Sequence, residues 1–384
     1  MSRKKSISVK VEPVVLKWIV GASGWTADEI VKKLKISLNT FERWLAGELN
    51  PTLNQLDALA STLKRPLAAF FLAVPPKELP LPKDYRMLPD RLGTFDKKTV
   101  LAIRRARRLQ KLSKELSENL NTNTIFITTK LSLSNNPVTV AENYRQEFDF
   151  TEEKQQKKLK NSYDVFNYLR DIIEDKNILS FQISMPVEDA RGFALVDKSP
   201  AIIVVNSKDT IEARIFTLIH EFGHVLLRES GISLPENSLV LKNVESVEKW
   251  CNDFASAFLF PESIARRAFT ENKSTIIETD TLNKLSRAYK LSKAMILYNM
   301  IKFNFISQVQ YESVLKRPKT EKAGKKSAGF GSRADKKCLN EKGQKFVSLV
   351  LSNVEKGFIT HSDALNYLSI KSNNLENVMR KARK

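Results

Sequence analysis

The stretch IFTLIHEFGHVLL, residues 215–227, holds two of the chain's three histidines, four residues apart around a glutamate. On a helix, positions i and i+4 lie on one face, so His220 and His224 can direct their imidazoles at one point, as two nitrogen ligands of zinc do. Glu221 projects beside that point, within reach of a water on the metal. The alternative is a pair of core histidines, which would need two separate hydrogen-bond partners inside an apolar helix. The pattern His-Glu-x-x-His therefore favours a zinc site.

A catalytic zinc needs a third protein ligand and an open fourth position. In the predicted helix VESVEKWCNDFASAFLFP, Glu248 lies one turn before Cys251 on the inward face, where an acid is costly unless it is paired or bound to metal. Glu248 is therefore the predicted third ligand; Glu245 is its main rival and Asp253 a weaker one. The alternative is an exposed acidic helix start that the helix dipole favours. Asn252, one turn after Glu248, is placed to hydrogen-bond the far nitrogen of a zinc histidine.

The other histidine and the two cysteines carry no comparable pattern. The spacing of Cys251 makes it a small packing residue rather than a soft metal ligand. Cys338 lies in a basic segment without a partner signal, and His361 is predicted to be a surface residue near a turn.

The composition of the chain restricts the class of protein. Sixty-three Lys and Arg face forty-three Asp and Glu, a formal net charge of +20, which favours a polyanionic partner such as nucleic acid over a merely solvated basic surface. Two cysteines give no disulfide framework, and a reducing cytosol fits. The N-terminus lacks the apolar stretch of a signal peptide, and the longest apolar run, residues 67–74, is too short to span a bilayer. We therefore expect a cytoplasmic protein without a membrane partner.

The N-terminal part of the chain predicts four short helices, over residues 13–20, 26–34, 37–47 and 52–63. The second and third predict a helix-turn-helix whose second helix enters the major groove of DNA. Asn39, Thr40 and Arg43, near the start of that helix, are the predicted DNA contacts, while Phe41 and Trp44 are predicted to pack inward. The alternative is a helical domain used only for protein contact or dimerisation. A homodimer would match two half-sites on DNA.

Changes of composition mark further segments. Clustered prolines after residue 75 indicate an extended connector, and a helix with a strong basic face is expected at 96–120. ILSFQIS, GFALVD and AIIVVN, within 178–206, predict three short strands. The basic segment 316–342 is expected to be mobile, and no internal repeat is evident. Further helices are expected over 209–228, 246–260, 278–316 and 345–370.

RGFALVD, PAIIVVN, ARIFTLIHEFGHVLL and EKWCNDFASAFLFP together resemble the ImmA/IrrE family of zinc-dependent metallopeptidases. The resemblance covers roughly residues 190–262, and it extends to DYR at 84–86 and to the tail at 343–370. The N-terminal helices are similar to the xenobiotic-response-element (XRE) type of helix-turn-helix. Two departures stand out: Cys251 replaces a common alanine, and Lys35 replaces the glycine usual in the turn of the helix-turn-helix.

The resemblance implies an enzyme that cuts a DNA-bound repressor or antitoxin. It implies His220, His224 and Glu248 as zinc ligands and Glu221 as the catalytic acid and base. We expect an α+β protein, with an all-helical N-terminal domain, a zincin-like domain with a small β-sheet and the HExxH helix, and a helical C-terminal tail. The predicted segments are a DNA-binding domain (1–74), a connector (75–95), a helical segment (96–175), a metallopeptidase domain (176–315), a basic segment (316–342) and a C-terminal region (343–384).

Two other interpretations remain alongside the enzyme. One is a sequence-specific repressor whose zinc domain only senses or binds a partner. The other is the toxin-side component of a toxin–antitoxin pair, with the peptidase-like domain as a binding platform. The intact His-Glu-x-x-His favours the enzyme, because a pure binding domain has no chemical need for Glu221. For the enzyme, the strand AIIVVN before the active helix is predicted to pair with an extended substrate.

Overall fold

The computed structural model describes residues 7–76, 95–125, 129–230, 232–233, 246–315 and 334–382. Its described residues divide into two compact units, and one boundary between them along the chain falls within helix α5 (Lys97–Asn119), after Arg105. The fold is mostly helical with one small sheet, in agreement with the α+β prediction. No helix in the described ranges is long and apolar enough to cross a membrane.

The first unit is built from short capped helices around an aromatic core. Thr26 and Thr52 each form a capping box with the residue three positions on, and Ser37 caps the third helix. Phe41, Trp44 and Phe70 are completely or almost completely buried between the helices. The elements are α1 (Pro13–Gly21), α2 (Ala27–Leu34), α3 (Leu38–Ala46), α4 (Leu53–Leu63) and η1 (Leu67–Phe71).

The first turns of α5 also belong to this unit, which the sequence did not predict. Lys97 pairs with Glu29 at 2.9 Å, and its ammonium lies 4.1 Å from the ring centre of Trp25. Arg104 donates to the main-chain carbonyls of Ala22 and Leu63. These contacts extend the N-terminal unit to Arg105, into residues that we had assigned to the separate helical segment 96–175.

The second unit contains the sheet and the remaining helices. Its elements up to the sheet are α6 (Pro137–Glu147), η2 (Lys154–Lys158), α7 (Ser162–Asp175), β1 (Ile178–Ile183), β2 (Gly192–Leu195) and β3 (Ala201–Asn206). They are followed by α8 (Ile211–Leu227), β4 (Ile232–Ser233), α9 (Ser246–Leu259), α10 (Glu262–Glu271), η4 (Lys273–Thr275), α11 (Thr279–Tyr289), α12 (Lys293–Lys302) and α13 (Gln308–Leu315). The last elements are α14 (Ala334–Lys342), α15 (Gln344–Glu355), α16 (His361–Leu368), η5 (Ser372–Asn374) and α17 (Leu375–Ala382).

The sheet has the strand order β1-β3-β2-β4. β1 is parallel to β3, whereas β2 is antiparallel to both of its neighbours. All residues of β1, β2 and β3 are buried, as expected for strands that are covered on both faces. The prediction that AIIVVN pairs with a substrate is wrong, because this strand is β3 and both of its edges already carry a partner strand.

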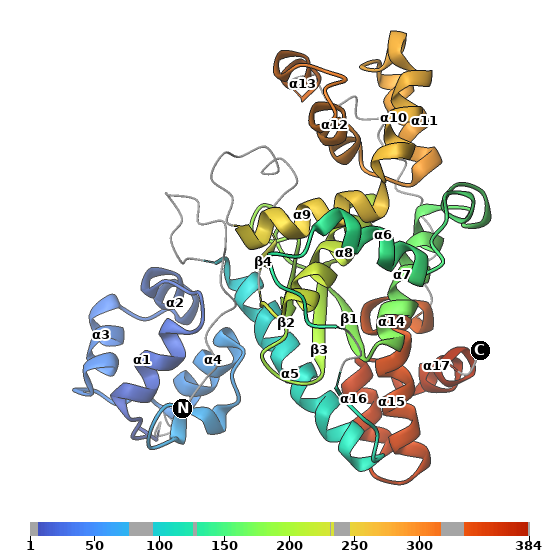
Figure 1. The fold of residues 1–384 in the computed structure, drawn as a ribbon. Coiled ribbons are helices and arrows are strands. Elements are labelled where there is room, and N and C mark those ends of the chain that lie inside the picture. Colours follow the sequence, from blue (N-terminus) through green and yellow to red (C-terminus); the bar gives the residue numbers. More distant parts are fainter. Residues whose placement is uncertain are drawn as a thin grey trace. The chain divides into compact units, whose positions relative to one another are not determined.

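Helix α8 is apolar on almost every side because it packs against neighbours on several sides. It contacts β2 and β3 of the sheet, and it also contacts α7 and α9 (Figure 1). Every residue from Ile215 to Leu227 is buried, which accounts for the continuous run of apolar side chains around the two histidines.

The C-terminal helices are anchored to α7 and β1 by a buried ion pair. Arg170 and Glu174 lie 3.2 Å apart, and both side chains are almost fully buried. Arg170 donates to the carbonyl of Asn340 at 2.7 Å, while Glu174 accepts from the backbone N–H of Lys345 at 2.9 Å. The Arg170–Glu174 pair thus fixes the turn between α14 and α15. The expectation that residues 334–342 are mobile is wrong, because they form helix α14 beside this pair. The rest of the basic segment, 316–333, lies outside the described residues.

We expect the replacement Lys35→Gly to stabilise the first unit. Lys35 ends α2 in the left-handed conformation, with φ 56° and ψ 45°, so the turn keeps this geometry without glycine. That conformation costs an L-residue roughly 1–2 kcal/mol, and the greater freedom of glycine in the unfolded chain offsets part of the gain, which leaves about 0.5–1 kcal/mol. Urea unfolding followed by tryptophan fluorescence measures the change in the free energy of unfolding. The signal reports on this unit because three of the four tryptophans (Trp18, Trp25 and Trp44) lie in it.

The matched control is Lys33→Gly, on the exposed side of α2. Glycine inside a helix costs about 1 kcal/mol, so this variant is expected to unfold at lower urea concentration than the wild type. A Lys35→Gly protein that is no more stable than the wild type would contradict a strained turn.

Candidate metal centre

Helix α8 places the two histidines of the motif on one face. Thr210 caps its first turn, and Arg228 ends it in the left-handed conformation. His220 and His224 lie one turn apart with relative exposures of 1% and 0%. Their Nε2 atoms are 3.2 Å apart, so the two rings converge on one point as the spacing predicts.

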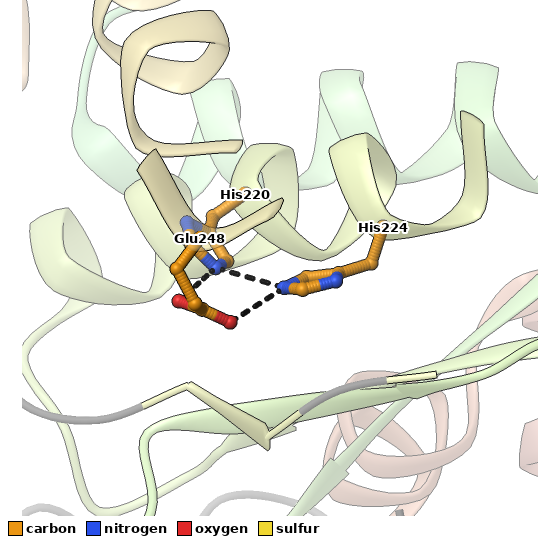
Figure 2. A group of neighbouring side chains, drawn as sticks. All are labelled: His220, His224 and Glu248. Atoms are coloured by element: carbon orange, nitrogen blue, oxygen red, sulfur yellow. Dashed lines mark hydrogen bonds and ion pairs between the residues drawn. The ribbon is translucent and has the colours of Figure 1, made fainter. Parts of the chain in front are cut away.

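Helix α9 supplies the third member of the cluster. Glu248, in its first turn, is fully buried. Its carboxylate oxygens lie 3.4 Å from His220 Nε2 and 3.0 Å from His224 Nε2 (Figure 2). Among the described residues, these three form the one group of His, Cys, Asp or Glu side chains with the spacing of a metal site.

The donor set and its dimensions fit a zinc ion. Two imidazole nitrogens and a carboxylate are ligands found in catalytic zinc sites, which leave a fourth position open. Ligands at 2.0–2.1 Å in tetrahedral geometry lie about 3.3 Å from one another, and the three separations here are 3.0, 3.2 and 3.4 Å. His220, His224 and Glu248 are therefore the residues that would hold the metal.

The close approach of α9 to α8 depends on Gly223, between the two histidines. A Cβ at this position would lie 3.2 Å from Cys251 Sγ and 3.3 Å from a ring carbon of Phe254, both on α9. A side chain here would require Cys251 and Phe254 to shift by a few tenths of an ångström, on the helix that carries Glu248. The sequence analysis missed this glycine, although an isolated glycine inside an apolar helix is a recognisable sign of close packing.

Glu221 also lies at a place where the backbone comes close. Its side chain is buried, and Oε1 lies 3.4 Å from the position that a Cβ on Gly192 would take. Such a Cβ would also collide with Thr217 at 2.4 Å and with the carbonyl of Val204 at 2.7 Å. Gly192, at the start of β2, therefore keeps the backbone of this strand beside the Glu221 carboxylate.

The two histidines favour the ionised form of the buried Glu248 carboxylate. Burial alone raises the pKa of Glu248, but His220 and His224 outweigh it and hold that pKa well below its usual range. Burial alone lowers the pKa of His224, but contacts with Cys251 and Glu248 outweigh it, so this pKa is raised well above its usual value. A bound cation would compete with protons for these groups.

None of the remaining described candidates from the sequence belongs to the group with metal-site spacing. Asp253 pairs with Lys302 at 2.6 Å, and Glu245 lies outside the described residues. Burial raises the pKa of the Cys251 thiol, which keeps it protonated and fits a packing role. Asn252 is buried one turn after Glu248. His361 is exposed at the start of α16 and takes no part in the cluster.

The predicted DNA contacts lie on the surface of the first unit. Asn39 and Arg43 are exposed on α3, and Arg43 pairs with Glu48 at 3.7 Å. The hydroxyl of Thr40 lies 2.8 Å from that of Ser37, so it belongs to the cap of the helix. Asn39 and Arg43 are thus exposed on α3, and Thr40 is partly exposed beside them.

A buried His-His-Glu cluster on helices packed against a small sheet has the donor set found in metallohydrolase sites. Residues 173–300 match the family model of the IrrE N-terminal-like domain. This match supports the ImmA/IrrE family for that segment and indicates a zinc-dependent protease of the IrrE/ImmA type. No curated protein matches the chain.

We expect Gly223→Ala to weaken zinc binding by roughly tenfold, because the added Cβ shifts α9 and with it the third ligand, Glu248. Alanine favours the helix itself, so a loss must come from the contact with Cys251 and Phe254. Competition with a chromophoric chelator measures the affinity. Gly21→Ala is the control, because a Cβ there meets nothing within 4 Å. Equal zinc affinity in both variants and the wild type would contradict the proposed role of the close packing.

Proposed function

We propose that this protein is a zinc-dependent endopeptidase that also binds DNA, and that it cuts a protein partner such as a repressor or antitoxin. The observation that carries the enzymatic part is the convergence of His220, His224 and Glu248 within the dimensions of a zinc site, with Glu221 on the same helix. The family match of residues 173–300 supports the same reaction class.

In this proposal each side chain has a separate task. His220, His224 and Glu248 hold the zinc ion, which when bound polarises a peptide carbonyl and lowers the pKa of a water molecule. Glu221 accepts a proton from the attacking water and transfers it to the leaving amine. Burial of all four side chains excludes bulk water and strengthens their interactions with the developing charge. Asn252 is proposed to orient one of the histidines.

The DNA-binding part of the proposal concerns α2 and α3. The two helices are joined by a three-residue turn, in which Lys35 is left-handed and Ser37 caps α3. Phe41 and Trp44 pack inward, whereas Asn39 and Arg43 face solvent, as the second helix of a helix-turn-helix requires. The net charge of +20 supports a nucleic-acid partner.

The cellular setting is a further part of the proposal. Both cysteines, Cys251 and Cys338, are free and buried, which fits a reducing cytoplasm. A homodimer would present two copies of α3 to two half-sites on DNA.

The catalytic assignment predicts that Glu221→Gln keeps about one zinc per chain and loses proteolysis, because the amide cannot accept the proton. Zinc is measured by mass spectrometry of the purified protein. Proteolysis is measured as new N-termini after incubation with a lysate of the source cells. His224→Ala is the paired variant, which is expected to lose both zinc and cleavage. A Glu221→Gln protein that produces the wild-type N-termini would exclude Glu221 as the base.

The DNA assignment predicts different effects for the two exposed residues of α3. Asn39→Ala is expected to cost about 1–3 kcal/mol of binding to the preferred sequence and to leave the salt dependence unchanged, since amides read base edges. Arg43→Ala is expected to reduce the salt slope by about one if it contacts a phosphate. Fluorescence anisotropy against a selected duplex measures both quantities.

Glu48→Ala is the matched control for the DNA assignment. It removes the acidic partner of Arg43 and is expected to strengthen binding. Absence of any binding by the wild type, even at low salt, would count against DNA as the ligand of this unit.

A further inference from the structure

The turn between α11 and α12 repeats the turn between α2 and α3. α11 ends at Tyr289, Lys290 is left-handed with φ 56°, Leu291 follows, and the Ser292 side chain caps α12 by accepting from Met295. The first unit has the same order, with Lys35 left-handed at φ 56°, then Ile36, then Ser37 as cap. The sequence analysis found no repeat because only the lysine and the serine are identical across the two turns.

The second helices of the two pairs differ in what they expose. At the position where α3 exposes Glu42, α12 carries Leu297, which is only 3% exposed. Asn299 of α12 is fully buried, as is Trp44 at the matching position of α3, and it accepts a hydrogen bond from Ser256 of α9 at 2.9 Å. Ala294, Met295 and Tyr298 stand where α3 carries Asn39, Thr40 and Arg43, so α12 lacks the side chains proposed to read base edges. A ligand of this helix pair would therefore be met by the turn and its surroundings.

The turn is fastened to η2, a segment more than a hundred residues earlier in the chain. Lys290 donates to the carbonyl of Gln156 at 2.7 Å, and Gln155 donates to the carbonyl of Tyr289 at 2.7 Å. Lys290 is 4% exposed, so its charge is directed into this contact. The contact places the residues that follow Gln156 next to the end of α11.

Exposed cations gather around this junction. We call them the junction cations: two follow Gln156, two lie on the outer side of α11, and one begins α12 (Lys157, Lys160, Lys284, Arg287 and Lys293). None of them forms an ion pair with a described residue, whereas nearby cations do. Lys158 pairs with Glu153, and Arg267 pairs with Glu152. Five positive charges at this junction therefore lie outside the ion pairs formed by the described residues.

The segments that carry the junction cations expose few of the apolar anchors of a protein interface; the nearest in sequence is Tyr163, three residues after Lys160 and 56% exposed. No large hydrophobic side chain is exposed within residues 154–160 or 279–302. Protein partners generally bury aromatic or aliphatic residues at the centre of an interface, whereas interfaces with DNA are polar and strongly positive. Exposed cations outside any ion pair, with few such anchors, match the backbone of a nucleic acid better than an acidic protein.

We propose that the junction cations bind the phosphate backbone of duplex DNA without reading its sequence. This site lies in the second unit and is separate from the DNA contacts proposed for α3. Contacts with phosphates position a protein on the duplex and carry no base information, which agrees with the lack on α12 of the side chains proposed to read base edges.

The test uses the full chain and a variant with all five junction cations replaced by alanine. Binding to a short duplex of arbitrary sequence is measured by anisotropy across a range of salt concentrations. Each phosphate contact contributes about 0.9 to the slope of log K against log salt, so the variant is expected to lose roughly 0.9 per contact and to bind tenfold or more weakly at low salt.

The matched control removes the same charge from other exposed sites of the second unit, by replacing Lys198, Lys249, Lys336, Lys356 and Lys371 with alanine. The proposal expects the slope of this control to stay close to that of the wild type. An equal loss in both variants would assign the effect to net charge and overturn the proposal. An unchanged slope in the junction variant would also overturn it.

A second measurement on the wild type does not depend on the folding of any variant. Duplex DNA is expected to protect Lys157, Lys160, Lys284 and Lys293 from acetylation, as read by mass spectrometry, and to leave the control lysines reactive. Equal protection of both sets would overturn the proposal. So would protection of the junction lysines by a cleaved protein partner but not by DNA, which would assign the surface to that partner.

Discussion

The site depends on one constraint, which is the burial of an ionised carboxylate between two imidazoles at the contact of α8 and α9. An ionised carboxylate left alone in an apolar interior costs several kcal/mol, so Glu248 is stable there only because His220 and His224 face it. Those rings reach it only because α9 passes close to α8, and at Gly223 the approach is so close that a Cβ would lie 3.2 Å from Cys251 Sγ. Packing and charge are therefore inseparable at this point.

The surrounding fold supplies what such a contact needs. α8 is held on one side by β2 and β3 and on another by α9, so neither histidine can move without disturbing the core. A second close approach, at Gly192, brings the backbone of β2 to the Glu221 carboxylate. Gly223 thus allows α9, and Gly192 allows β2, to approach the side chains of the site closely. Rigid neighbours of this kind keep a site preorganised for a metal.

The two helix pairs show how the same local turn can serve different surroundings. Lys35 and Lys290 adopt the same left-handed conformation, each followed by an apolar residue and a capping serine. α3 has solvent on its outer side, whereas α12 is buried against α9. Local sequence sets the geometry of the turn, and tertiary packing decides which side chains a ligand can reach.

Much of this protein is determined by short-range signals in its sequence. Helix caps such as Thr26 and Ser37, the alternation of polar and apolar positions, and the spacing of His220 and His224 act within one or two turns, so the helices, three of the strands and the two converging imidazoles follow from them. The third position of the cluster was predictable because an acid on an inward helix face needs a partner.

Contacts between distant segments were not predictable. The order of the sheet, which gives β3 a partner on each edge, depends on pairing among strands that periodicity does not specify. The anchoring of α14 by Arg170 and Glu174 and the docking of the α11–α12 turn on η2 join residues over a hundred positions apart. Only the tertiary structure decides these contacts, because their stability comes from groups that meet after the chain has folded.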